Sequence, residues 1–504
     1  MSFTGNFLSF KRHIPTCMLL LTMVLVGIYL LRPLYDPDFY WHLKTGQWIW
    51  QHKALPHTDL FGIPPFPESS PRTEFIYTSY WLLQLILYGF YSLFGMSGII
   101  VFRWIIACVS LLTAMYWTDV RDSNVSAVIA IGSVQLLELY FIERPQFVSF
   151  VCFGILLVLL LRAIGQGNRS LWGTLVPLSV LMMVWANMHG GFLIGQAILI
   201  FCVAAEGIKF CHSSLSPLSA GNYRILVISA ASALLASFIN PNAVNLIKYL
   251  PLIFDSNYYV NVNNLEEFSL LRYFQETRDS TMLLYGASIA LTAVALLTSR
   301  YRKNITWVGI LAGTAFMGCL HMRLMPFFLV SATILMTRYF ERECTSVKGR
   351  VLLFSMLAIT LFYSVGDEFS RIHESTRTGW VPIHQFPVRS SDFIVSNAIS
   401  GNIYTTMLWG GYMIWRAGPV DKIFYDGRTL NVQRAWEYDN SRIVSPNQRP
   451  YWKGLFAAYD IRVAVLPLYE DDGRPNLLTQ SIRSDKEWTM VFAAENEVVL
   501  LKSR

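Results

Sequence analysis

Two carboxylates, an imidazole and an amine lie close together in segment 35–44, directly after the first long apolar run. Asp36 and Asp38 flank Pro37, and His42 follows four residues after Asp38. Proline disfavours helical geometry in the residue before it, so the acids are expected on a bend at a helix end. Such a carboxylate pair could orient or deprotonate an acceptor, or hold a divalent cation. An ordinary polar cap on a helix that leaves the membrane is the alternative.

Three further turns carry polar groups that could join this pair at the outer ends of apolar segments. The candidates are Glu143 and Arg144, Asn187 and His189, and His321 and Arg323. Arg323 is the lone Lys or Arg of its own short outer loop. It could hold an anionic phosphate and stabilise charge on a leaving group. The alternatives are a polar turn with an internal ion pair, a structural imidazole, and an arginine that reaches lipid headgroups.

Membrane helices must position these residues. The chain has 504 residues, 54% of them hydrophobic and only 14% charged, whereas a soluble chain carries roughly 25% charged residues. About 20 residues cross a bilayer, and shorter spans must borrow polar flanks. The expected spans, about eleven, are Ile14–Leu31, Gly98–Trp117, Val125–Ile142, Phe147–Leu161, Leu171–Ala186, Phe192–Ile208, Ile225–Phe238, Met282–Thr298, Thr306–Leu320, Leu324–Thr337 and Val351–Ser364.

The loop charges favour a cytoplasmic N-terminus. With this orientation the short inner loops carry 14 basic residues and the short outer loops carry few, which is the positive-inside pattern. An odd number of crossings then places the segment after Ser364 outside. The apolar segment Trp81–Phe94 would reverse later loops if it crossed, so it is predicted to be an interfacial helix that ends at Gly95. It belongs to a long first outer loop, residues 33–97.

The last part of the chain, residues 366–504, has a different character from the membrane part, residues 1–365. It carries 16 basic and 16 acidic residues. Short apolar runs alternate with polar and helix-like segments, which predicts a small extracytoplasmic α/β domain. The detailed expectations are an extended Val381–Phe393, strands at Gly401–Met407, Lys422–Tyr425, Val463–Leu466, Met490–Ala493 and Val498–Leu501, turns at Trp409–Tyr412 and Asp426–Arg428, and a helix at Arg449–Tyr459.

Several function classes find no support in the sequence. The net charge of +7 belongs to the membrane part and reflects topology, and nothing indicates a nucleic-acid partner. The seven cysteines offer neither a disulfide framework nor a zinc site. No nucleotide-binding glycine loop, zinc helix motif or nucleophile elbow is present. The inner loops are too short for a nucleotide-sugar site, which favours a lipid-borne donor.

The first outer loop resembles that of a known superfamily. Asp36-Pro37-Asp38-Phe39-Tyr40-Trp41-His42 is similar to the D-P-W-F-N-Y-R stretch of oligosaccharyltransferase catalytic subunits. Asp36 and Tyr40 also match the spacing of D-E-x-x-Y in protein O-mannosyltransferases and aminoarabinose transferases. These are GT-C membrane glycosyltransferases, in which an interfacial helix leads through an F-G-x-S segment and an arginine into the second crossing. Here that segment is Phe94-Gly95-Met96-Ser97, followed by Arg103.

The resemblance implies transfer of a sugar from a polyprenyl-phosphate donor to a protein, glycan or lipid acceptor on the outer face of the cell (inner) membrane. It makes Asp36 the catalytic carboxylate. Asp38 departs from both family patterns, and it is either a second ligand or a surface acid. The need for a cofactor, such as a divalent cation, stays open. The alternative function is a non-catalytic membrane scaffold or a transporter, since folds outlive their activities.

Overall fold

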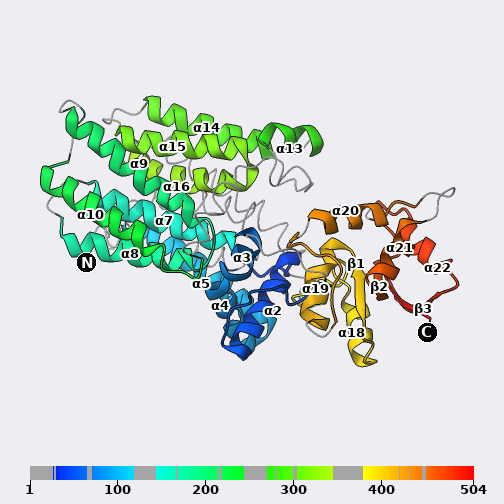
Figure 1. Ribbon diagram of the computed structural model, residues 1–504. Coiled ribbons are helices and arrows are strands. Elements are labelled where there is room, and N and C mark those ends of the chain that lie inside the picture. Colours follow the sequence, from blue (N-terminus) through cyan, green and yellow to red (C-terminus); the bar gives the residue numbers. More distant parts are fainter. Residues whose placement is uncertain are drawn as a thin grey trace, which may run out of the picture.

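The structure is a computed structural model of the chain. It describes residues 27, 30–64, 71–117, 144–165, 169–212, 215, 218–242, 269–277, 281–298, 304–343, 379–418, 421–430, 432–444, 450–470 and 472–503. A bundle of helices forms one part, and a small sheet with its own helices forms the other (Figure 1).

Long apolar segments form the helices of the bundle. They are α5 (Met96–Trp117), α7 (Gln146–Ala163), α8 (Leu171–Ala186), α9 (Phe192–Cys211), α10 (Ala220–Ala236), α14 (Thr281–Thr298), α15 (Ile305–Leu320) and α16 (Met325–Glu343), with short α13 (Leu270–Thr277) and the 3-10 turn η3 (Met322–Leu324). Each expected span within the described residues is therefore a helix. In the described part of the chain, α7 and α9 are long and apolar enough to cross a membrane, and six further apolar helices are shorter. The number of eleven crossings stays a prediction, because 125–142, 351–364 and most of 14–31 lie outside the described residues.

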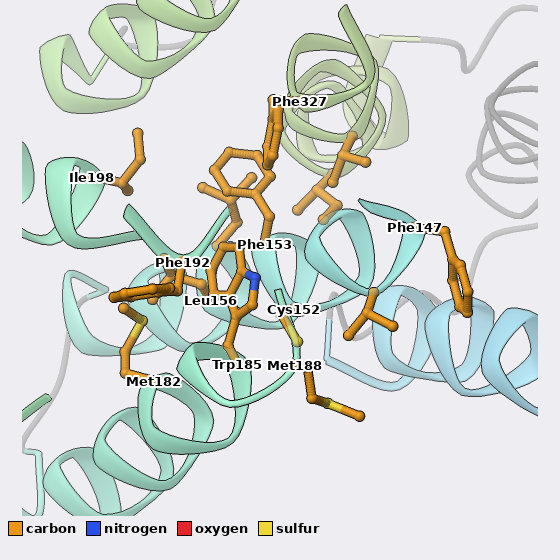
Figure 2. Close-up of a cluster of buried hydrophobic side chains, with 14 of the residues drawn as sticks. Phe147, Cys152, Phe153, Leu156, Met182, Trp185, Met188, Phe192, Ile198 and Phe327 are labelled. Carbon is orange, nitrogen blue, oxygen red and sulfur yellow. The ribbon is translucent and has the colours of Figure 1, made fainter. Parts of the chain in front are cut away.

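Helix α7 lies in the middle of the bundle. Phe153 and Leu156 of α7 are fully buried, as is Trp185 of α8, and Phe192 of α9 is nearly so. Figure 2 shows these side chains gathered in one cluster. The indole Nε1 of Trp185 donates to Ser149 Oγ on α7 at 2.7 Å, so the polar tip of this buried ring is paired. This contact joins the start of α7 to the end of α8, next to the turn that carries Asn187 and His189.

Three helices of the first outer loop lie at the junction between the bundle and the sheet (Figure 1). They are α2 (Pro37–His52), α3 (Pro71–Thr78) and α4 (Trp81–Phe94). The helix α4 has the predicted bounds and ends at Gly95, whose φ of 61° favours glycine. A Cβ at Gly46 of α2 would lie 2.1 Å from the Gln84 carbonyl oxygen of α4, so glycine permits this close crossing. The interfacial location of α4 stays a prediction.

The C-terminal part contains a four-stranded sheet of order β1-β2-β4-β3. Its strands are β1 (Asn402–Thr405), β2 (Ile461–Pro467), β3 (Trp488–Ala494) and β4 (Glu497–Lys502), and its helices are α18 (Val388–Ser396), α19 (Met407–Ala417), α20 (Val432–Ser441), α21 (Tyr451–Ala458) and α22 (Leu477–Arg483). Strands β1 and β2 are parallel, and the other pairs are antiparallel. The predicted mixture of strands and helices is confirmed, whereas its first residue, 366, lies outside the described ranges.

Three local predictions for this part were wrong. Residues 388–396 form helix α18 where an extended segment was expected. Trp409–Tyr412 lies inside helix α19 and forms no turn. Segment 422–425 makes only isolated bridges, in which Ile423 pairs with Ile403 on one side and with Gly62 on the other. The last bridge attaches the first outer loop to the edge of the sheet, a contact between distant segments that local patterns do not encode.

Candidate active site

Asp36 is the N-cap of helix α2. Its backbone is extended, as expected for a residue before proline, and its Oδ1 accepts a hydrogen bond from the Asp38 amide at 2.7 Å. Pro37 begins the helix, where the lack of an amide hydrogen has no cost. The predicted bend is thus confirmed. Asp36 is only 2% exposed, so its carboxylate faces the protein interior.

Arg144 joins the two acids. Its Nε donates to Asp36 Oδ2 in a short ion pair, and its terminal nitrogen lies 3.6 Å from Asp38 Oδ2. The side chains of Arg144 and Asp38 are 20% and 23% exposed, so this group has one face toward solvent. We name Asp36, Asp38 and Arg144 the acid–arginine cluster. It unites two turns that the sequence predicted to share a site, although Glu143 lies outside the described residues.

The surroundings of Asp36 shift its pKa toward neutral pH. Burial raises its pKa to about 7, because a charged carboxylate is poorly solvated there. The Arg144 guanidinium acts in the opposite direction, and the negative charge of Asp38 raises the pKa further. A carboxyl group that titrates near pH 7 can accept a proton at physiological pH and release it again.

Buried contacts hold the chain that leads into Asp36. The guanidinium of Arg103 donates to the carbonyl oxygens of Leu30, Arg32 and Pro33 at 3.4, 2.8 and 3.4 Å. Arg103 on α5 therefore pairs with three carbonyl groups in residues 30–33, the segment that leads into Asp36. This gives a physical role to the arginine that carries part of the sequence resemblance.

Tyr40, the aromatic residue of the same resemblance, connects α2 to the C-terminal part. Its hydroxyl donates to the Leu34 carbonyl oxygen at 3.1 Å. Its ring makes edge contacts with Phe386 and Tyr412, with centroids 4.9 Å apart in both pairs. The start of α2 is thus in contact with the C-terminal part through Phe386 and through Tyr412 of α19.

A row of rings extends from the acid–arginine cluster into the protein. Trp41 lies against His42 with centroids 3.5 Å apart, His42 lies 5.0 Å from Tyr80, and Tyr80 lies 5.8 Å from His189. Gln84 Nε2 lies 3.0 Å from His42 Nδ1. Burial lowers the pKa of His42 well below its ordinary value, and the charge of Arg144 adds to this. His42 is therefore neutral.

His189 is a neutral hydrogen-bond donor. Its Nδ1 accepts from the Gly191 amide at 3.0 Å and lies 2.6 Å from Ser149 Oγ, so its proton is on Nε2. Burial lowers its pKa to about 3, and the positive charge of Arg323 contributes. The charge of Arg323, in the turn η3, therefore acts on His189. His321, the residue before η3, is exposed, and its role in binding stays a prediction.

Asn187 has a structural task. Its Oδ1 accepts from Trp81 Nε1 at 2.8 Å, and its Nδ2 donates to the carbonyl oxygens of Met183 and Ile239, both at 2.8 Å. The side chain therefore ties the start of α4 to the ends of α8 and α10. A part in substrate binding stays a prediction for Asn187.

The structure adds a buried ion-pair group that the sequence did not reveal. Arg428 donates to Asp59 Oδ1 and to Asp426 Oδ1, both at 2.7 Å, and all three residues are buried. Asp59 belongs to the first outer loop, 369 residues away from Arg428. The sequence predicted a turn at Asp426–Arg428 but carried no sign of its partner Asp59.

The same turn contacts the acid–arginine cluster. A Cβ at Gly427 would lie 2.2 Å from Asp38 Oδ1, and a Cβ at Gly411 of α19 would lie 2.1 Å from the Pro37 carbonyl oxygen. These glycines thus permit the C-terminal part to approach the start of α2. Close approach between backbone segments is therefore the reason for these two glycines.

No family model matches the chain, and no curated protein matches its sequence. Solved structures do match. The archaeal oligosaccharyltransferase AglB from Archaeoglobus fulgidus, in complex with an inhibitory peptide and a dolichol-phosphate, matches with a TM-score of 0.58 and 10% identity over 91% of this chain and 70% of that one. ArnT from Cupriavidus metallidurans, bound to undecaprenyl phosphate, matches with a TM-score of 0.54 and 12% identity over 99% and 98%.

The chain has the GT-C fold. The arabinofuranosyltransferase AftD from mycobacteria is similar as well, with a TM-score of 0.55 and 13% identity over 98% of this chain and 42% of AftD. A further structure of the Archaeoglobus enzyme is a complex with Zn and sulfate. The resemblance inferred from the first outer loop is therefore confirmed at the level of the fold. In this GT-C fold, the acid–arginine cluster lies where the bundle, the first outer loop and the C-terminal part meet.

Proposed function

We propose that this protein is a membrane glycosyltransferase that moves a sugar from a polyprenyl-phosphate-linked donor to an acceptor. The fold it shares with AglB, ArnT and AftD supports this proposal. So do the lipid phosphates in the AglB and ArnT structures. The observation that carries the proposal is the buried Asp36 beside Arg144, with a pKa near neutrality, at the junction of three parts of a GT-C fold.

In the proposed reaction, an acceptor hydroxyl or amide attacks the anomeric carbon of the donor sugar. The bond from that carbon to the phosphate oxygen breaks, and the polyprenyl phosphate leaves with the bonding electrons. Asp36 orients the acceptor and takes its proton. Asp38 and Arg144 hold the Asp36 carboxylate in place.

The donor phosphate requires hydrogen-bond donors and positive charge. Arg323 supplies the charge and His189 supplies an Nε2 hydrogen, since its Nδ1 is already an acceptor. Both lie on turns that follow bundle helices, where a lipid-borne headgroup would reach them. Donors that are fixed before the reaction stabilise the charge that develops on the leaving phosphate.

The proposed orientation places this site on the outer face of the cell (inner) membrane. The N-terminus is then cytoplasmic, and residues 366–504 are extracytoplasmic, as the positive-inside pattern favours. The C-terminal part contacts the start of α2 through Gly411 and Gly427, so it would cover the site and receive a protein, glycan or lipid acceptor.

The competing function is a transporter or a scaffold. A transporter favours ionisable groups near the middle of the membrane and helices broken by glycine or proline. Pro177 inside α8 and the buried pair of Glu206 and Lys209 on α9 are features of that kind. A scaffold would keep the fold without any need for a titrating carboxyl group beside an arginine.

Two measurements on the purified full chain separate these functions. Mass spectrometry of the lipids that co-purify should find a polyprenyl-phosphate sugar. Incubation with polyprenyl-phosphate sugars of several kinds should release free polyprenyl phosphate when extracts that contain acceptors are added. Lipid binding without any release would favour the scaffold, and the absence of both would reject the proposal.

A further inference from the structure

The four oxygens of the Asp36 and Asp38 carboxylates each face a hydrogen-bond donor. Asp36 Oδ1 accepts from the Asp38 amide at 2.7 Å, and Asp36 Oδ2 accepts from Arg144 Nε. Asp38 Oδ1 accepts from Trp41 Nε1 at 3.3 Å, and Asp38 Oδ2 lies 3.6 Å from a terminal nitrogen of Arg144. Asp36 Oδ2 and Asp38 Oδ2, which could together bind one cation, thus both lie beside the guanidinium of Arg144.

A divalent cation at this position would need a different donor set. Mg²⁺ prefers octahedral oxygen ligands, and softer metals such as Zn²⁺ take up nitrogen and carboxylate oxygen. Within the described ranges, no group of three or more His, Cys, Asp and Glu side chains could hold a metal. A cation between the carboxylates would also approach the positive charge of Arg144 closely, and the two would repel.

The two imidazoles near the acid–arginine cluster already have hydrogen-bond partners at Nδ1. His189 Nδ1 accepts from the Gly191 amide, and His42 Nδ1 lies at hydrogen-bond distance from the Gln84 amide nitrogen. His189 is held as an Nε2–H tautomer, which donates a hydrogen bond and has no lone pair for a metal on that nitrogen. These residues do not fit the metal site that a zinc-containing GT-C neighbour suggests.

We infer that the Arg144 guanidinium occupies the position in which a divalent cation would bridge Asp36 and Asp38, so that this chain carries out its chemistry without an added divalent cation. Arg144 is a positioning residue in this arrangement. It neutralises the repulsion between the two acids and orients the Asp36 carboxylate, as a planar fork of donors can. That the reaction needs no added divalent cation depends on the proposed glycosyl transfer. That Arg144 occupies the cation position does not depend on it.

Direct binding of Mn²⁺ tests the position without any enzymatic assay. Electron paramagnetic resonance should detect no Mn²⁺ bound through Asp36, so the full chain and its Asp36→Asn variant should bind equal amounts. Arg144→Ala should create a saturable Mn²⁺ site, and the double variant Asp36→Asn with Arg144→Ala should lose it. A site in the unsubstituted protein that disappears in Asp36→Asn would overturn the inference, even if Arg144→Ala fails to fold.

The transfer assay tests the chemical consequence. The full chain should keep its rate in excess EDTA. Arg144→Ala should lose about 10-fold or more, as expected for a displaced catalytic group, and guanidinium ions or Mn²⁺ should restore part of the rate. Loss of the wild-type rate in EDTA, with recovery on added Mn²⁺, would overturn the inference. If the full chain transfers no sugar under any condition, the proposed function fails, and the Mn²⁺ binding experiment still decides the position of Arg144.

Discussion

Gly427 of the C-terminal part lies directly against Asp38 of the first outer loop. A Cβ on Gly427 would lie 2.2 Å from Asp38 Oδ1, closer than atoms can approach. The turn that carries Gly427 is itself fixed by Arg428, which pairs with Asp426 and Asp59. The position of one acid in the cluster is therefore set by a segment almost 400 residues further along the chain.

A methyl group at this contact should displace Asp38. For Gly427→Ala, we expect transfer to fall by about 10- to 100-fold, because Asp38 helps to hold Asp36 and a misplacement of about 1 Å can cost this much. The rate of sugar transfer and the apparent melting temperature are measured together. The matched control is Gly454→Ala in α21, where a Cβ meets no atom within 4 Å. Equal rates in both variants would show that the contact has no part in the reaction.

The rate should rise with pH through the pKa of Asp36. A carboxylate that accepts a proton works only when it is deprotonated, so kcat/KM should increase around pH 7. The negative charge of Asp38 raises the pKa of Asp36. Asp38→Asn should therefore move the ascending limb of the profile to lower pH. The control is Asp472→Asn on an exposed turn, and an unchanged profile in Asp38→Asn would contradict the assignment of the limb to Asp36.

The buried group of Arg428, Asp59 and Asp426 should stabilise the junction between the first loop and the C-terminal part. Arg428→Leu leaves two buried carboxylates without their counter-charge, which costs about 3–5 kcal/mol in comparable cases. The apparent melting temperature of the full chain should fall by several degrees. Arg474→Leu, which breaks a pair at the surface, should leave the melting temperature nearly unchanged, because exposed ion pairs contribute little to stability.

The effect of Arg428→Leu should depend on pH. Burial opposes ionisation of Asp59, but the charge and hydrogen bonds of Arg428 lower its pKa overall. An acid whose pKa is lower in the folded state stabilises the protein above its unfolded pKa, about 3.9, and this contribution disappears as the pH falls through the folded value. The difference in melting temperature between Arg428→Leu and the unsubstituted chain should therefore be largest near neutral pH and should shrink in strong acid. A constant difference would mean that Arg428 acts by packing alone.

Several of the helices could be predicted from local patterns. The apolar run Trp81–Phe94 followed by Gly95, and the run Leu171–Ala186, became helices with those bounds. The meeting of Asp36 with Arg144 also agrees with the sequence, whose predicted topology places both residues at outer ends of apolar spans.

Contacts between distant segments could not be predicted in the same way. The pairing of Gly62 with Ile423 and of Asp59 with Arg428 leaves no periodic pattern in either segment. The glycines of Trp409–Tyr412 were interpreted as turn residues, yet they lie in helix α19, where Gly411 allows the close approach of the Pro37 carbonyl group. A close approach and a turn both require glycine. Only the segment that packs against the glycine shows which of the two is the reason.

The role of Asp36 is the central claim, and one variant tests it most directly. Asp36→Asn keeps the size of the side chain and removes the carboxylate that would accept the proton. With a polyprenyl-phosphate sugar as donor, its rate of transfer should be about 10²- to 10⁴-fold lower than that of the unsubstituted chain, at a similar melting temperature. A folded Asp36→Asn protein that transfers sugar as fast as the unsubstituted chain would contradict the account.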